Sequence, residues 1–152
     1  MVQLLDNKNL ETAERILALQ KASYQIEADL IGFPKLPPML ENTEDIMSSQ
    51  ETYYGYFVDG VLAGILSYII EEDVLDIYKV AVHPNFFKRG IARQLLQKIE
   101  QTEGIDRITV STGLKNTPAV NLYTSIGFCK VQEKEVVKNL YIVSFEKQIK
   151  AL

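Results

Sequence analysis

A strand, a break and the start of a helix follow one another closely in the middle of the chain, at residues 80–93. Val80–Val82 is apolar, Pro84 interrupts it, and an amphipathic helical pattern begins after Gly90. The first backbone N–H groups of a helix have no partners within it and lie at the positive end of the helix dipole, so they attract phosphate oxygens. This segment therefore predicts a phosphate-bearing ligand lying against the end of a sheet strand.

The length and composition are those of a globular protein. A chain of 152 residues, 47% of them apolar, is long enough for one domain with a hydrophobic core, so we expect a single domain over residues 1–152. The net charge of −4 argues against a dedicated nucleic-acid binder, and we expect no nucleic-acid partner. A local group of cations nevertheless lies close together in the sequence: Lys79, Lys88, Arg89, Arg93 and Lys98.

The chain has one cysteine, Cys129, and one histidine, His83. They allow no intramolecular disulfide and no metal site built from the usual sulfur and nitrogen ligands, so we expect no metal. Cys129 is predicted to be a small buried apolar side chain. The first residues show no secretory pattern, and no apolar run is long enough to cross a bilayer. We therefore expect a cytoplasmic protein without a membrane partner.

Changes in the period of the hydrophobic pattern divide the chain into strands and helices. Asn9 is predicted to cap the first helix, Asp59-Gly60 to form a type I′ hairpin turn, and Pro37-Pro38 to mark a loop. A helix from Gly90 should make the two strands that it connects parallel. The predicted elements in chain order are strand 2–5, helix 9–32 (ended by Gly32-Phe33-Pro34), helix 42–49, strands 52–58, 61–70 and 74–82, helix 90–102, strand 107–111, helix 116–127, and a hairpin of strands 128–135 and 140–147.

Two segments in this order carry a resemblance to a known family. Phe87-Lys88-Arg89-Gly90-Ile91-Ala92 matches a pattern of Arg or Gln, two residues, Gly, one residue and then Gly or Ala, except that Phe87 replaces the Arg or Gln. Residues 116–128 supply the second pattern: Asn116 with a small residue at a helix start, Leu-Tyr within the helix and Gly-Phe at its end. Over nearly its full length the chain resembles the GCN5-related N-acetyltransferase (GNAT) family.

The resemblance implies a mixed α/β fold. Its centre would be one mostly antiparallel sheet of about seven strands flanked by about four helices, in the order β-α-α-β-β-β-α-β-α-β-β. It also implies the activity of an N-acetyltransferase, which moves an acetyl group from acetyl-CoA to a primary amine by direct attack in a ternary complex. Many members of the family dimerise, so a homodimer is among the arrangements that the resemblance allows. Neither the amine nor its class, small molecule or peptide, follows from the sequence.

The same resemblance implies which residues bind the cofactor acetyl-CoA. Backbone N–H groups of the loop would hold its pyrophosphate, the strand before the loop would face its pantetheine arm, and Asn116 would contact that arm. Phe87 removes any polar side-chain contribution at its position, which Lys88 or Arg89 would have to supply. The implied cofactor-binding residues are Val80, Ala81, Val82, Lys88, Arg89, Gly90, Ile91, Ala92, Arg93, Asn116, Ala119 and Tyr123.

Tyr123 is the candidate catalytic residue. By the resemblance its hydroxyl would lie near the thioester sulfur and protonate the leaving thiolate, although a core aromatic would fit the same helical stripe. The general base is open between a water chain and a carboxylate on or before the central strand: Glu71, Glu72, Asp73 or Asp76. His83, next to Pro84, is expected to serve local packing or capping rather than catalysis. Asn121 is either a surface residue or a cofactor contact.

The acceptor pocket of the family draws on the first two helices and the last hairpin. Here these are Tyr24–Ser49 and Lys134–Tyr141, with candidate lining residues Tyr24, Glu27, Phe33, Pro37, Pro38 and Met39. Aromatic rings beside a carboxylate would suit a cationic amine, and they would equally suit a core beneath a loop. Two other functions stay open: a non-catalytic protein of this fold that binds acyl-CoA, and a phosphate-binding regulatory domain unrelated to CoA.

Overall fold

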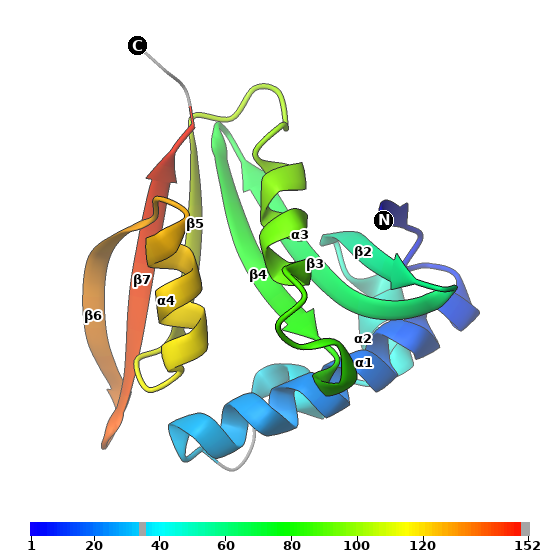
Figure 1. The fold of residues 1–152 in the computed structure, drawn as a ribbon, viewed down its shortest axis with the longest axis horizontal. Helices are drawn as coiled ribbons and strands as arrows, with labels where there is room; N and C mark the ends of the chain where they lie inside the picture. Colours follow the sequence, from blue (N-terminus) through cyan, green and yellow to red (C-terminus); the bar gives the residue numbers. More distant parts are fainter. Residues whose placement is uncertain (34–35, 150–152) are drawn as a thin grey trace.

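A seven-stranded sheet with helices on both faces forms the centre of the protein (Figure 1). The computed structural model describes residues 1–33 and 36–149. Within them the strand order is β1-β2-β3-β4-β5-β7-β6, with β4 and β5 as the parallel pair. This mixed, mostly antiparallel sheet confirms the predicted fold class.

The elements, with η for a 3₁₀ helix, are β1 (Val2–Leu5), α1 (Leu10–Ile31), η1 (Pro37–Leu40), α2 (Thr43–Ser48), β2 (Thr52–Val58), β3 (Val61–Glu71), β4 (Val74–Val82), η2 (Pro84–Phe86), α3 (Ile91–Ile99), β5 (Arg107–Gly113), α4 (Thr117–Ser125), β6 (Cys129–Val137) and β7 (Leu140–Gln148).

Side chains of β3 enter two hydrophobic clusters, one on each face of the sheet. Leu66 and Tyr68 pack with α3 and with Tyr123 of α4. Leu62 and Ile65 pack with α1 and α2 in the other cluster. Alternate side chains of a strand point to opposite faces, and a register shift between Leu62 and Gly64 reverses the alternation, so Leu62 and Leu66 lie on opposite faces. Helices α3 and α4 therefore cover one face of the sheet, and α1 and α2 cover the other (Figure 1).

Local signals in the sequence explain several element boundaries. Asn9 and Asn42 cap α1 and α2 by accepting backbone hydrogen bonds through their side-chain oxygens. Gly32 ends α1 with a φ of 71°, a left-handed conformation that glycine adopts easily. Asp59 and Gly60, with φ of 50° and 80°, form the type I′ turn predicted between β2 and β3.

The structure also departs from the predicted boundaries. The loop expected at Pro37-Pro38 contains η1, and η2 follows β4, because proline fixes a φ that suits the first position of a helical turn. Strand β5 continues to Gly113, and α3 ends at Ile99. Pro34, assigned to the end of the first helix, lies outside the described residues. Over residues 1–33 and 36–149, no helix combines the length and the apolar character that crossing a membrane requires.

Two predictions of burial are wrong. Cys129 is exposed, because it lies on β6, the last strand of the sheet, where every residue is exposed. Lys79 is only 5% exposed and does not belong to a surface group of cations. It lies on the central strand β4, and its side chain points beneath α1 and α2 rather than toward the loop before α3.

Candidate functional site

Strands β4 and β5 separate halfway along their length. Their parallel pairing covers Val74–Asp76 against Arg107–Thr109, although β4 continues to Val82 and β5 to Gly113. In Figure 1 the two strands open toward α1 like the arms of a V. A cavity of about 920 Å³ lies at this opening, lined by both strands and by α1, α3 and α4. The edge of β4 that faces β5 therefore leaves its backbone groups available to a ligand.

The loop between η2 and α3 forms one end of the cavity. Lys88 and Gly90 have φ of 64° and 73°, so both residues adopt the left-handed backbone conformation just before α3 begins. Among the described residues no side chain caps α3, and a Cβ built on Gly90 would meet no atom within 4 Å. The first N–H groups of α3 therefore face open space, which fits a phosphate group at the start of a helix.

Side chains of this loop line the same end of the cavity. The Arg89 guanidinium lies over the Phe86 ring, 5.1 Å from its centroid, and Arg93 donates a hydrogen bond of 3.0 Å to Ser125 Oγ of α4. Phe87, the residue that departs from the family pattern, is 43% exposed and lines the cavity. Its φ of −61° and ψ of 154° are ordinary extended values, so Phe87 does not disturb the backbone of the loop.

The residues predicted to bind the cofactor gather around this one cavity. Ala81 is the exception, because its side chain is 2% exposed and packs in the cluster beneath α1. Only its backbone remains as a contact for a ligand along β4. The predicted residues that line the cavity are Val80, Val82, Lys88, Arg89, Gly90, Ile91, Ala92, Arg93, Asn116, Ala119 and Tyr123.

Asn116 lies at the start of α4 and is nearly enclosed. Its Oδ1 accepts a hydrogen bond of 3.3 Å from the backbone N–H of Ala119, so it caps the helix. Its Nδ2 donates to Thr112 Oγ1 of β5 at 3.4 Å. These two long hydrogen bonds hold the amide at the wall of the cavity, next to Glu27.

Tyr123 is both a core aromatic and a cavity residue. Its ring lies 5.7 Å from the ring of Phe128 and 5.8 Å from that of Phe145, and it is 4% exposed. Burial raises the pKa of its hydroxyl above the ordinary value, and the charge of Glu27 raises it further. The hydroxyl therefore keeps its proton at neutral pH. The two interpretations of Tyr123 left open by the sequence are compatible with each other.

The other end of the cavity lies against α1. Tyr24, Glu27, Pro37 and Pro38 line it as expected, whereas Met39 packs in the cluster beneath α1. Burial raises the pKa of Glu27 above its ordinary value, and the nearby Asn116 amide offsets part of that rise. Burial raises the pKa of Tyr24 in the same way, and the charge of Glu27 adds to the shift. Sequence reasoning named Glu27 as a lining residue and missed it as a candidate base.

The carboxylates that the sequence offered as candidate bases lie elsewhere. Glu71, Glu72 and Asp76 line a smaller hollow of about 310 Å³ at the far end of β4, and neither they nor Asp73 line the main cavity. Asp76 accepts a hydrogen bond of 2.7 Å from Thr109 Oγ1 on β5.

Two further polar residues also stand outside the main cavity. His83 accepts a hydrogen bond of 3.1 Å from the backbone N–H of Asn85 through Nδ1, which agrees with its expected capping role. Asn121 is exposed on α4 and does not line the cavity.

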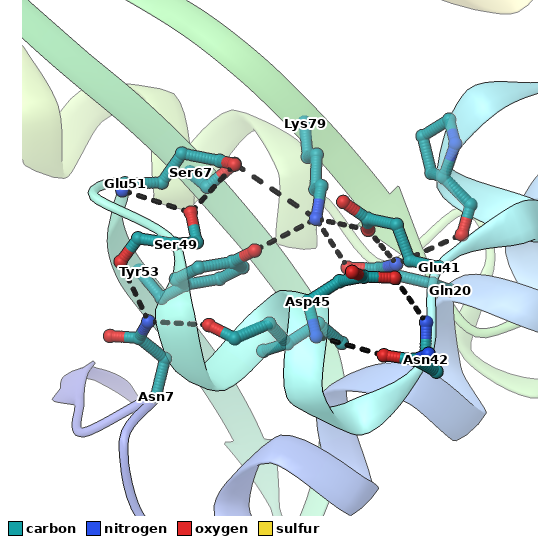
Figure 2. Close-up of polar contacts among 12 residues, drawn as sticks. Asn7, Gln20, Glu41, Asn42, Asp45, Ser49, Glu51, Tyr53, Ser67 and Lys79 are labelled. Atoms are coloured by element: carbon teal, nitrogen blue, oxygen red, sulfur yellow. Dashed lines mark hydrogen bonds and ion pairs between the residues drawn. The ribbon is translucent and has the colours of Figure 1, made fainter.

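Figure 2 shows Lys79 at the centre of a buried polar cluster. Its Nζ donates hydrogen bonds to Gln20 Oε1 at 2.9 Å, Glu41 Oε1 at 2.6 Å and Tyr53 Oη at 2.7 Å. Gln20 in turn donates to the backbone carbonyl of Pro38 at 3.2 Å. The cluster thus ties α1 and η1 to the central strand, and η1 is part of the cavity wall.

Glu51 completes this cluster on the side of β2 (Figure 2). It accepts hydrogen bonds from Ser67 Oγ at 2.6 Å and Ser49 Oγ at 2.8 Å, and it lies 3.9 Å from Lys79 Nζ. Glu41 and Glu51 therefore share Lys79 as a cation, and it offsets part of their combined negative charge. No sequence signal predicts this arrangement, because its members come from distant segments with no common spacing.

The Acetyltransferase (GNAT) family matches residues 14–128 of this chain. The chain belongs to the GNAT acetyltransferase family. The UPF0157 protein YqkA of Bacillus subtilis (strain 168) is 38% identical to it over 146 residues, which cover 95% of this chain and 43% of that protein. The chain therefore spans less than half the length of this relative.

Solved structures share the GNAT fold over essentially the whole chain. The ribosomal-protein-S18-alanine N-acetyltransferase from Escherichia coli superposes with a TM-score of 0.79 at 14% identity, covering 100% of this chain and 95% of that one. The PaiA N-acetyltransferase from Thermoplasma acidophilum, in complex with coenzyme A, gives a TM-score of 0.72 at 18% identity, covering 97% and 99%. At such low identity these likenesses show the fold alone, and they confirm the architecture implied by the sequence resemblance.

GNAT proteins use acetyl-CoA as their acetyl donor. The loop end of the cavity has features that fit the phosphates of such a donor: open amides at the start of α3 and the cationic side chains of Lys88, Arg89 and Arg93. In the part of the chain that the structure describes, no three His, Cys, Asp or Glu side chains lie together as ligands of a metal ion.

Proposed function

We propose that this GNAT protein transfers the acetyl group of acetyl-CoA to a primary amine, of a small molecule or a peptide, by direct attack within a ternary complex. One observation carries the proposal: a single cavity joins the open start of α3 to the carboxylate of Glu27 on α1. A donor with its phosphates at α3 and an amine near α1 would meet inside this cavity. Holding both partners in place is the main source of rate acceleration in such a reaction.

The donor end of the cavity would bind acetyl-CoA through backbone and cationic groups. The amides of residues 88–93 and the adjacent cations would hold the pyrophosphate, while the open edge of β4 at Val80–Val82 would bind the pantetheine arm together with Asn116 and Ala119. When bound, acetyl-CoA supplies an activated acetyl thioester. A backbone N–H of β4 directed at the thioester carbonyl would stabilise the negative charge that develops on its oxygen.

Tyr123 would donate a proton to the leaving sulfur. A tyrosine hydroxyl is protonated over the neutral range, and burial raises the pKa of Tyr123 further, so Tyr123 holds a proton that it can donate. The rings of Phe128 and Phe145 fix the orientation of Tyr123 and leave it little freedom to turn away from the cavity.

The test measures thiol release from acetyl-CoA with a panel of primary amines, alongside CoA binding by calorimetry and by the shift of the melting temperature. Turnover of at least one amine supports the proposal. Binding of CoA without turnover of any amine, even at alkaline pH, would favour a non-catalytic acyl-CoA-binding protein. A melting temperature that CoA does not raise would favour a phosphate-binding domain unrelated to CoA.

A further inference from the structure

Three carboxylates line the cavity: Glu27, Glu41 and Glu51. Two of them share one cation, because Lys79 Nζ lies 2.6 Å from Glu41 and 3.9 Å from Glu51. Glu27 differs from both. Among the described residues no lysine, arginine or histidine forms an ion pair with it. A largely enclosed carboxylate without a cation costs folding free energy, and a cationic ligand would relieve that cost.

The position of Glu27 along α1 places it among the groups that would react. Tyr24 lies one turn before it and Ile31 one turn after it, and all three line the cavity. The charge of Glu27 raises the pKa of both Tyr24 and Tyr123, so the carboxylate lies within electrostatic reach of the proposed proton donor. Glu27 and Tyr123 thus approach the same part of the cavity from α1 and α4.

The wall around Glu27 is mainly apolar. Its apolar members come from α1, η1 with the residue before it, and β7: Leu30, Ile31, Leu36, Pro37, Pro38 and Ile142. Leu30 is 47% exposed in the protein alone, so it offers surface that a ligand could cover. An acceptor with an apolar group beside its amine would gain free energy from covering this wall, whereas a small polar amine would not.

We infer that Glu27 binds the ammonium group of the acceptor and acts as its general base, and that the acceptor carries an apolar group next to the amine. This inference rests on the proposed function and deepens it. One N–H bond of the ammonium breaks and its proton passes to Glu27, which later releases it to solvent. The nitrogen lone pair forms the bond to the acetyl carbon, and the C–S bond breaks with its electron pair on sulfur. Tyr123 gives that sulfur its proton and takes back the second proton that the nitrogen loses as the amide forms.

The environment of Glu27 makes this role measurable by pH. A base with a raised pKa takes a proton from an ammonium group more readily than an exposed carboxylate does. The ionisable groups that share the cavity are Tyr24, Tyr78, Tyr123, Lys79 with Glu41 and Glu51, and the cations Lys88, Arg89 and Arg93 at the donor end. Of these, Tyr24 and Tyr123 are neutral in the neutral range, as tyrosine ordinarily is, and burial raises the pKa of each further.

The experiment compares Glu27→Gln, Glu27→Asp and the matched control Asp29→Asn, which removes one charge from the exposed side of the same helix. Two primary amines of similar basicity serve as probes, 2-phenylethylamine and ethanolamine. We expect Glu27→Gln to lower kcat/KM for 2-phenylethylamine about 100-fold at neutral pH, Glu27→Asp to lower it less, and Asp29→Asn to leave it unchanged. The loss in Glu27→Gln should shrink as the pH approaches the pKa of the amine, because a free amine needs no base. CoA affinity should be the same in all four proteins.

The wild-type protein should prefer 2-phenylethylamine over ethanolamine by about tenfold or more in kcat/KM. Equal activity of Glu27→Gln and Asp29→Asn, or a loss in Glu27→Gln that stays constant with pH, would overturn the assignment of Glu27 as the base. A preference for ethanolamine would overturn the inferred class of acceptor. Wild-type protein that binds CoA and acetylates neither amine, nor any other, would instead overturn the proposed function itself.

Discussion

Lys79 and Glu41 form an ion pair of 2.6 Å that joins the central strand β4 to the segment between η1 and α2. Lys79 is 5% exposed, so the pair is shielded from solvent on the lysine side. Gln20 bonds to both residues and to the carbonyl of Pro38, which carries the link into the wall of the cavity. One buried lysine thus fixes the acceptor side of the cavity to the strand along which the donor is proposed to lie.

Replacing this lysine should destabilise the protein strongly. Lys79→Met leaves Glu41 and Glu51 without the cation that they share, and removing one member of a buried ion pair typically costs about 3 kcal/mol or more. Urea unfolding measures the loss. The control Lys21→Met, at an exposed position of α1, should change the free energy of unfolding by less than about 0.5 kcal/mol. Similar stabilities of the two variants would show that the buried cluster contributes little.

Gly90 and Gly104 offer a matched test of the donor end. Both have positive φ, 73° and 82°, and a Cβ on either would meet no atom within 4 Å, so glutamate adds the same backbone strain and charge at each. Only Gly90 lines the cavity. Gly90→Glu should weaken CoA binding about 10- to 100-fold in calorimetry, because hydrogen bonds to charged groups contribute about 1.5–3 kcal/mol each. Gly104→Glu should leave it unchanged. Equal CoA affinities of the two variants would show that the loop before α3 does not bind CoA.

Tyr123→Phe separates the hydroxyl from the ring. The packing against Phe128 and Phe145 is retained, so stability and CoA affinity should stay close to those of the wild type. Turnover of 2-phenylethylamine should fall about 100-fold, as expected for loss of a general acid. The control Tyr68→Phe removes a hydroxyl from another buried tyrosine that does not line the cavity, and it should keep full turnover. Full activity of Tyr123→Phe would leave Tyr123 with a packing role only.

Protonation of Glu27 should also change the stability of the folded protein with pH. Its pKa in the folded protein is raised above the ordinary value of 4.5, so the folded state holds the proton more tightly than the unfolded state does. The stabilisation from the protonated form is complete at pH below the ordinary pKa and is lost as the pH rises through the raised one. Glu27→Gln, which stays neutral, should therefore melt at a higher temperature than the wild type at neutral pH, with the gap closing in acid. Asp29→Asn should show no such pH-dependent gap; a gap of the same size there would contradict the account of Glu27.

The fold was largely predictable because its signals are local. Asn9 and Gly32 mark the ends of α1, Asp59-Gly60 fixes a hairpin, and the helix after Gly90 makes β4 and β5 parallel. The widening of the gap between β4 and β5 has no such local signal. It depends on where pairing stops between strands that are distant in sequence, and only the structure locates that point at Asp76 and Thr109.

The site was predictable at its donor end and much less so at its acceptor end. A helix start and a glycine loop carry their chemistry in the backbone, which the sequence reveals. The acceptor end depends on which carboxylates already have a cation, and that is decided by Lys79, whose partners Gln20, Glu41 and Tyr53 come from separate elements. For the same reason the sequence offers Glu71, Glu72, Asp73 and Asp76 as candidate bases and does not single out Glu27.

The most direct test of the central claim is to incubate the protein with acetyl-CoA and 2-phenylethylamine and to quantify N-acetyl product and free CoA together by mass spectrometry. The account requires N-acetyl-2-phenylethylamine to form in step with released CoA, at a rate well above that of the protein-free mixture. Saturable CoA binding without acetylated product, from this amine or any other and at any pH, would contradict it.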